Sequence, residues 1–193
     1  MKESMEIPRM GFTEAIKACI KKSFVFKGRA RRSEYWWWVL FNFLLGLVVS
    51  LVGGFIPTDN LWLAGIFSLI VILGSLYLAI ASAAVNVRRL HDVGISGWWY
   101  GGTLIYLLVW TIWFMVEYFR VALNLNLAPN ATPDMVSNAI LMQLIAKILI
   151  TYIPFMIYSV VLLVFYCLDS KPGANKYGEN PKGVPAEEPA LQE

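Results

Sequence analysis

One polar stretch in the middle of an otherwise apolar chain holds residue types that could do chemistry. This stretch, RRLHDVGISGWWY (residues 88–100), contains two arginines, the single histidine of the chain and an aspartate. Arginine matches the geometry of phosphate and carboxylate groups. A histidine held by a carboxylate is a candidate acid–base pair. Backbone N–H groups of the Gly94, Ser96 and Gly97 turn would lie beside these side chains.

Two further polar motifs also stand next to hydrophobic runs. They are GRARRSEYWWW (residues 28–38) and DSKPGANKYGENPKG (residues 169–183). If the three motifs meet in space, they form one candidate cluster, which comprises Arg29, Arg31, Arg32, Glu34, Arg88, Arg89, His91, Asp92, Asp169, Asn175 and Tyr177.

The composition indicates that membrane helices position these motifs. The 193 residues are 58% hydrophobic and 15% charged, whereas soluble domains are about 45–50% apolar and about 25% charged. Apolar runs of about 20 residues are long enough to cross a bilayer core of roughly 30 Å. We therefore predict an all-α membrane protein, a bundle of four transmembrane helices over about residues 36–56, 61–85, 98–116 and 148–168.

A basic amphipathic helix is predicted before the first span. Its apolar face consists of Phe12, Ala15, Ile16, Cys19, Ile20 and Phe24. Such a helix typically lies in the membrane interface, although packing against the protein's own loops is an alternative. Thr13 is the expected N-cap of this helix, and Ser33 that of the first span. We expect a single domain over residues 11–183 between disordered segments 1–10 and 184–193.

The distribution of basic residues predicts the orientation of the chain. Of the 16 Lys and Arg residues, 14 lie in the first 35 residues, the central stretch and the C-terminal motif. Arg120 is the single basic residue of the mixed polar segment 117–139, and Lys147 stands at a predicted helix end. The positive-inside rule therefore predicts four spans with both termini in the cytoplasm, which brings the three polar motifs to the same face.

Small residues at four-residue spacing predict how the first two spans pack. The first span carries one such stripe and the second carries another, so that the backbones can approach closely. The two stripes are Gly46, Ser50 and Gly54, and Ser75, Ala79 and Ala83.

The three motifs, in this order and at these membrane boundaries, resemble the YhaH-like bacterial inner-membrane proteins, a family described as domain of unknown function 805. The resemblance extends over about residues 12–183. It implies a small multi-pass protein of the bacterial cytoplasmic (inner) membrane and implies no reaction. Segment 117–139 looks like an insertion relative to shorter family members.

The sequence leaves several roles open for the candidate cluster. Arginine–carboxylate pairs could lock the helix bundle at its inner end, or the arginines could bind an anionic lipid or a phosphorylated ligand. An enzyme would need a base and an orienting group, such as His91 with Glu34 or Asp169. A transporter would need ionisable groups near the midplane, where the spans have almost none. A small partner of a larger membrane complex fits equally well.

Other chemistry has little support in the sequence. A single histidine and two cysteines without metal-ligand spacing predict neither a multi-histidine metal site nor a disulfide framework. We expect no catalytic residues and no cofactor, and lean towards a protein that is not an enzyme. The expected partners are the lipid bilayer and, as alternatives, an anionic or phosphorylated ligand, further copies of the chain or a larger membrane complex. Nucleic acid is not an expected partner.

Overall fold

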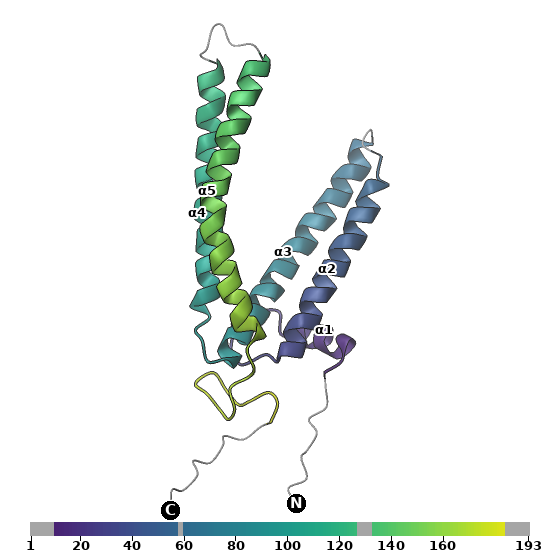
Figure 1. The fold of residues 1–193 in the computed structure, drawn as a ribbon. Helices are drawn as coiled ribbons and strands as arrows, with labels where there is room; N and C mark the ends of the chain where they lie inside the picture. Colours follow the sequence, from purple (N-terminus) through teal and green to yellow (C-terminus); the bar gives the residue numbers. More distant parts are fainter. Residues whose placement is uncertain (1–9, 58–59, 127–132, 184–193) are drawn as a thin grey trace, which may run out of the picture. The chain divides into compact units, whose positions relative to one another are not determined.

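A computed structural model describes residues 10–57, 60–126 and 133–183. Five helices lie within these residues and no strand does: α1 (Phe12–Lys21), α2 (Arg32–Gly54), α3 (Leu61–Asp92), α4 (Trp98–Asn126) and α5 (Pro133–Cys167) (Figure 1). The segments predicted to be disordered, 1–10 and 184–193, lie outside the described residues except for Met10.

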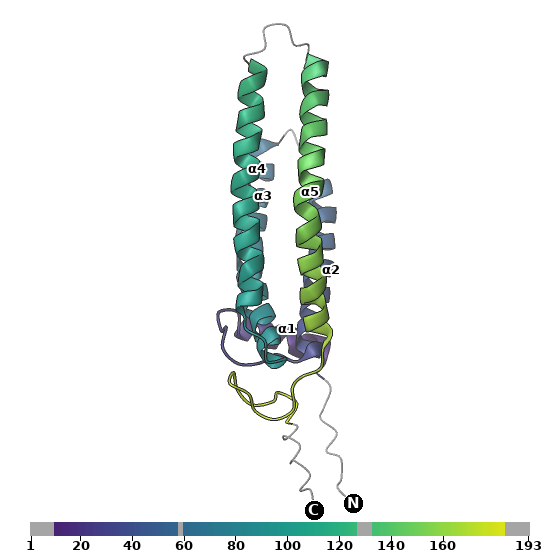
Figure 2. The same cartoon turned by 60° about the vertical axis from the view of Figure 1, so that its left-hand side comes forward.

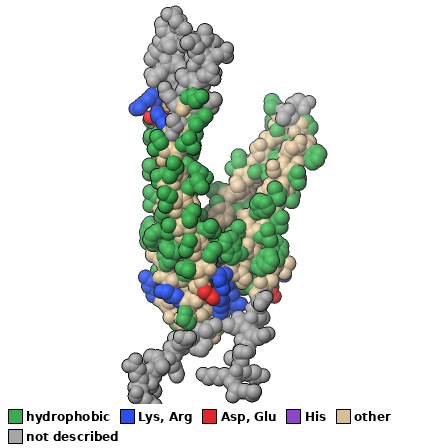
Figure 3. Space-filling view, viewed as in Figure 1, with side chains coloured by type: hydrophobic (Ala, Val, Ile, Leu, Met, Phe, Trp, Pro, Cys, Tyr) green, Lys and Arg blue, Asp and Glu red, His purple; other side chains and the backbone are tan. Residues whose placement is uncertain are grey.

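The four long helices confirm the prediction of an all-α membrane protein. In the described part of the chain, α2, α3, residues 98–120 of α4 and residues 147–167 of α5 are each long and apolar enough to span a membrane. Hydrophobic side chains cover the length of the helices on the face shown in Figure 3, and charged side chains gather near helix ends. This is an integral membrane protein.

The chain folds as two compact units. One contains α1, α2, α3 and the residues from Phe165 onward, and the other runs from Trp99 to Val164. The candidate cluster falls entirely in the first unit. Figure 2 shows α4 and α5 side by side in the second unit.

Helix α3 continues seven residues beyond its predicted end at Val85 and includes residues 88–92, the charged part of the central polar motif. Arginine and leucine favour helix, so a change from apolar to charged residues marks the membrane boundary without ending the helix. Gly94, with φ of +81°, ends it. The N–H groups of Gly94 and Ile95 donate to the carbonyls of His91 and Leu90, which is a Schellman cap.

Helices α2 and α3 pack against each other, but not through the predicted stripes of small residues. Most stripe residues are exposed, and a Cβ atom on Gly46 or Gly54 would meet nothing within 4 Å. The close approach is at Gly53, where a Cβ atom would lie 3.3 Å from the Phe67 ring. Trp38 also donates to the Ser82 hydroxyl at 3.0 Å. The stripe prediction is wrong because a spacing of four residues does not show which helix face meets the partner.

Helix α1 packs mainly on the first turns of α2. Ala15 and Cys19 are fully buried there, and Phe12 meets Trp37 edge to face at 5.6 Å. Both predicted N-caps are wrong: α1 is capped by Gly11, whose N–H donates to Glu14, and α2 begins after Arg31. Part of the predicted apolar face therefore contacts protein.

Helices α4 and α5 form a hairpin joined by polar and aromatic contacts. Trp110 donates to the Thr151 hydroxyl at 3.1 Å, and Tyr106 stacks on Phe155. Lys147, at the predicted start of the last span, forms an ion pair of 2.6 Å with Glu117. Both helices extend into segment 117–139, predicted to be mixed and polar, because it keeps enough apolar and helix-favouring residues.

Candidate functional site

The C-terminal end of α3 is the centre of the candidate site. The last carbonyls of a helix have no partner inside it and carry partial negative charge. Here the carbonyls of the last turns accept from segments near both ends of the chain. The N–H of Ala30 donates to Arg88 O at 3.1 Å, the Asn175 amide donates to His91 O at 2.9 Å, and the N–H of Lys171 donates to Asp92 O at 3.2 Å. The three sequence motifs therefore meet at one helix end.

Asp92 is the buried carboxylate of the site. Its Oδ1 accepts from Arg29 Nε at 2.9 Å, and its Oδ2 accepts from Arg89 Nη1 and from the Ser170 hydroxyl, each at 2.5 Å. The side chains of Asp92 and Arg89 are fully buried and that of Arg29 is 1% exposed. We call these four residues, Arg29, Arg89, Asp92 and Ser170, the Asp92 clasp.

Arg29 uses its guanidinium group to hold residues 168–183, here called the C-terminal loop. Besides Asp92, its nitrogens donate to the carbonyls of Lys171 at 2.6 Å, Gly173 at 2.8 Å and Gly178 at 3.4 Å, and to the Asp92 carbonyl at 3.2 Å. These five bonds occupy the five N–H groups that an arginine has. Arg29 therefore has no donor left for an external anion.

Arg89 and Arg32 satisfy the end of α5. Arg89 donates to the carbonyls of Tyr166 and Leu168, and Arg32 donates to the carbonyl of Cys167 at 3.4 Å. A cation at a helix C-terminus is stabilised by the partial negative charge there. These two arginines thus cap the C-terminal end of α5.

Glu34 and Arg88 form a second buried ion pair, 2.8 Å long, between α2 and α3. Arg88 also donates to the Ala84 carbonyl at 3.3 Å, while its Nη2 has no partner among the described residues. Cys19 lies 3.9 Å from the Glu34 carboxylate, and burial is the main cause that raises the pKa of this thiol to about 12. The pair joins α2 to α3, and Cys19 brings α1 to the same place, one turn of α3 before Asp92.

His91 is stacked on a tyrosine of the C-terminal loop. Its ring lies 3.8 Å from the Tyr177 ring at an interplanar angle of 6°, and its Nδ1 is 3.3 Å from the Gly28 carbonyl. Glu34 pairs with Arg88 and Asp169 with Arg32, so neither carboxylate orients His91 in the way that an acid–base pair requires.

The remaining predicted residues lie at the rim of the site. Arg31 donates to the Pro181 carbonyl at 2.6 Å. Asp169, 3.2 Å from Arg32, also accepts from Lys182, whose hydrogen bond is the main cause that holds the pKa of Asp169 below its usual range. Sequence reasoning missed Ser170, Cys19 and the loop carbonyls. Of these, only Ser170 could have been found from the sequence, because it has a polar side chain next to Asp169 in the C-terminal motif.

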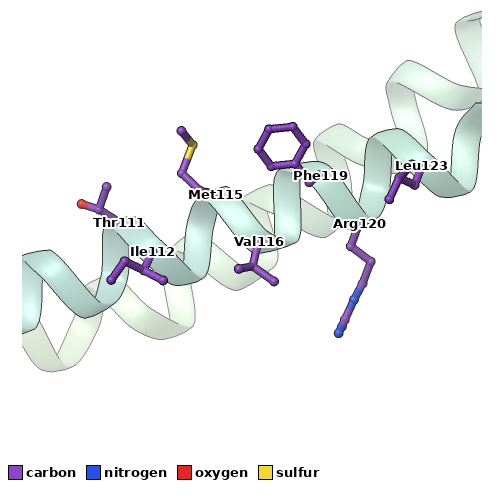
Figure 4. A pocket seen from close by; sticks show the side chains of 7 residues that line it. All are labelled: Thr111, Ile112, Met115, Val116, Phe119, Arg120 and Leu123. Carbon is purple, nitrogen blue, oxygen red and sulfur yellow. The ribbon is translucent and has the colours of Figure 1, made fainter.

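Three grooves lie away from this site, in the α4–α5 unit. One of about 670 Å³ runs along one side of α4 (Figure 4) and is lined by Thr111, Ile112, Met115, Val116, Phe119, Arg120 and Leu123. Smaller ones near Pro154 are lined mainly by aromatic side chains. Within the described residues, no three His, Cys, Asp or Glu side chains form a group that could hold a metal ion.

Comparison with known proteins gives the family. The profile of the family described as "Protein of unknown function (DUF805)" matches residues 23–179, which include the first two polar motifs and residues 169–179 of the third. The chain belongs to this family. It is 27% identical to inner membrane protein YhaI of Escherichia coli strain K12, over 84% of this chain and 92% of the relative. It is 34% identical to inner membrane protein YhaH of the same strain, over 52% of this chain and 79% of the relative. No solved structure shows significant similarity to the chain.

Proposed function

We propose that this DUF805 protein is a non-enzymatic assembly protein of the bacterial cytoplasmic membrane. In this proposal the Asp92 clasp keeps the C-terminal loop folded on the α1–α3 unit and so presents a fixed cytoplasmic surface to other membrane proteins. The observation that carries it is the saturation of Arg29, whose guanidinium group binds only Asp92 and loop carbonyls. Buried and saturated arginines favour a lock over a site for anionic ligands.

The contacts of Arg29 also support the proposed orientation. They join residue 29 to residues 171, 173 and 178, so the segments before α2 and after α5 lie on the same side of the membrane. This requires an even number of crossings, in agreement with four spans. The excess of Lys and Arg in these segments favours the cytoplasm as that side.

Limited trypsin digestion of membrane vesicles tests both parts of the proposal. Lys176 and Lys182 are the cleavage sites of the C-terminal loop, since Lys171 precedes Pro172 and trypsin does not cut a Lys–Pro bond. In inside-out vesicles, we expect the wild-type loop to resist trypsin and the loop of Asp92→Asn to be cut. Asp169→Asn, which removes only a solvent-exposed carboxylate, is the matched control and should behave as the wild type.

Two outcomes would overturn the proposal. Equal cleavage of the wild type and Asp92→Asn would show that the clasp does not order the loop. Cleavage in right-side-out vesicles would refute the orientation. Arg29→Lys, which keeps the charge but has three donors instead of five, separates loss of the lock from global misfolding. We expect its loop to be cut while its helices remain resistant.

Chemical crosslinking in native membranes tests the assembly role. We expect crosslinks from Lys171 or Lys176, which are exposed on the loop, to a distinct membrane protein or a second copy, and we expect Asp92→Asn to lose them. If the wild type and the variant give the same crosslinks, the ordered loop is not the docking surface.

A further inference from the structure

The end of α1 and the turn after it expose apolar side chains that no described element covers. The exposed fractions are 49% for Ile20, 68% for Phe24, 45% for Val25 and 43% for Phe26. Exposed lysines flank this patch, namely Lys21, Lys22 and Lys27. We call residues 20–27 the α1 knuckle. Clustered apolar side chains surrounded by lysines are typical of segments that bind membrane surfaces.

Contacts to α3 fix the depth of the α1 knuckle. The hydroxyl groups of Ser23 and Tyr77 are 2.9 Å apart, and the Phe24 ring lies 6.3 Å from the Tyr77 ring. From Leu61 to Val87, α3 carries no charged residue. At 1.5 Å per residue this stretch is about 40 Å long, and Tyr77 is about 24 Å from its start. The hydrocarbon core of a bilayer is roughly 30 Å thick, so wherever it falls along this stretch it contains Tyr77. Tyr77 then lies about 6–16 Å inside the core boundary that is nearer the Asp92 clasp.

The other side of α1 faces protein. Ala15 and Cys19 are fully buried against α2, and Cys19 lies next to Glu34. The helix therefore does not rest on the membrane through its whole apolar face. Only its C-terminal end is both exposed and held beside the apolar part of α3, with the lysines near the height of the headgroups.

We propose that the α1 knuckle is a lipid-binding wedge. Ile20, Phe24, Val25 and Phe26 insert among the acyl chains of the leaflet next to the Asp92 clasp, and the flanking lysines bind the headgroups of anionic phospholipids. Lysines close to an anionic leaflet are attracted to it, and aromatic side chains suit the interface. This inference does not rest on the proposed assembly role, since it uses only the contacts of α1 with α2 and α3.

Spin labelling of the full chain in nanodiscs of phosphatidylglycerol and phosphatidylcholine tests the depth. The label is placed at Val25→Cys, and in a second variant at Phe26→Cys, in a Cys167→Ser background. Cys19 is buried and remains. We expect these labels to collide with oxygen more than with a water-soluble nickel complex, as a label at Val48 on α2 should. A label at exposed Ala174 of the C-terminal loop should show the opposite preference.

Two results would overturn the wedge. If the labels at positions 25 and 26 behave like the one at Ala174, the α1 knuckle faces water. If they are shielded from both reagents, a protein covers it instead of lipid.

The lysines are tested separately, by energy transfer from a dye at position 25 to fluorescent phosphatidylglycerol or phosphatidylcholine. We expect phosphatidylglycerol to be enriched near the dye at least twofold, and the enrichment to vanish when Lys21, Lys22 and Lys27 are changed to Gln. The same change at Lys171, Lys176 and Lys182 is the matched control and should leave it unaltered. Enrichment that survives the first triple change would refute the role of these lysines.

Discussion

Replacing Asp92 by Asn should destabilise the protein more than any single change at its exposed charges. The carboxylate accepts from Arg29, Arg89 and Ser170, and neither arginine side chain is more than 1% exposed. Asparagine removes the negative charge and turns an N–H donor towards one of these donors, so that buried guanidinium groups lose their counter-charge. Breaking a buried ion pair on one side costs about 3–5 kcal/mol of unfolding free energy.

The assay is unfolding in mixed micelles of mild detergent and SDS, followed by circular dichroism or tryptophan fluorescence. Asp169→Asn is the control. Its side chain is 60% exposed, and its partners Arg32 and Lys182 are 44% and 28% exposed. Exposed pairs contribute about 0–1 kcal/mol. If Asp92→Asn lost no more stability than Asp169→Asn, the reasoning that places a buried counter-charge at the centre of the site would be refuted.

Three other predictions use the same preparations. Arg88→Leu, which leaves Glu34 buried without its partner, should cost about 3–5 kcal/mol, and the double change with Glu34→Leu should cost less. If the double change lowered the free energy of unfolding more than Arg88→Leu alone, this prediction would be contradicted. Because burial raises the pKa of Cys19 to about 12, this thiol stays protonated at pH 7. Iodoacetamide should therefore modify exposed Cys167 in the folded protein and Cys19 only after denaturation, and equal rates would show that Cys19 is accessible. Gly97→Ala would place a Cβ atom 2.7 Å from a methyl group of α3 and should cost about 1–3 kcal/mol in the same unfolding assay, whereas a neutral result would mean that the turn can shift.

The membrane spans and the meeting of the three motifs were predictable because each depends on a property of the sequence itself. Long stretches without charge indicate spans, and the placement of Lys and Arg indicates which segments share a side. Together they predict that residues near Arg29, Asp92 and Asn175 come together, as they do. No knowledge of packing is needed for this.

The pairings inside the cluster could not be predicted in the same way. Several arginines and several carboxylates allow many pairings, and Asp92 was only one of the three carboxylates in the predicted cluster. Most acceptors of Arg29 and Arg89 are backbone carbonyls, such as that of Gly173, which have no signature in the sequence. The sequence also did not show which face of α2 packs on α3. The close contact is made by Gly53 and not by the predicted stripe.

The long-range contacts of Arg29 can form only late in synthesis. Its loop acceptors follow it in the sequence by 142 to 149 residues. At about 5–20 residues per second, Arg29 leaves the ribosome roughly 7 to 30 seconds before they do. During that interval α2, α3, α4 and α5 are synthesised while the end of α3 still lacks the caps from the C-terminal loop. A chain that has not yet placed its last helix therefore differs from a finished one in that Arg29 and Arg89 still lack their carbonyl acceptors at the end of α5 and in the C-terminal loop.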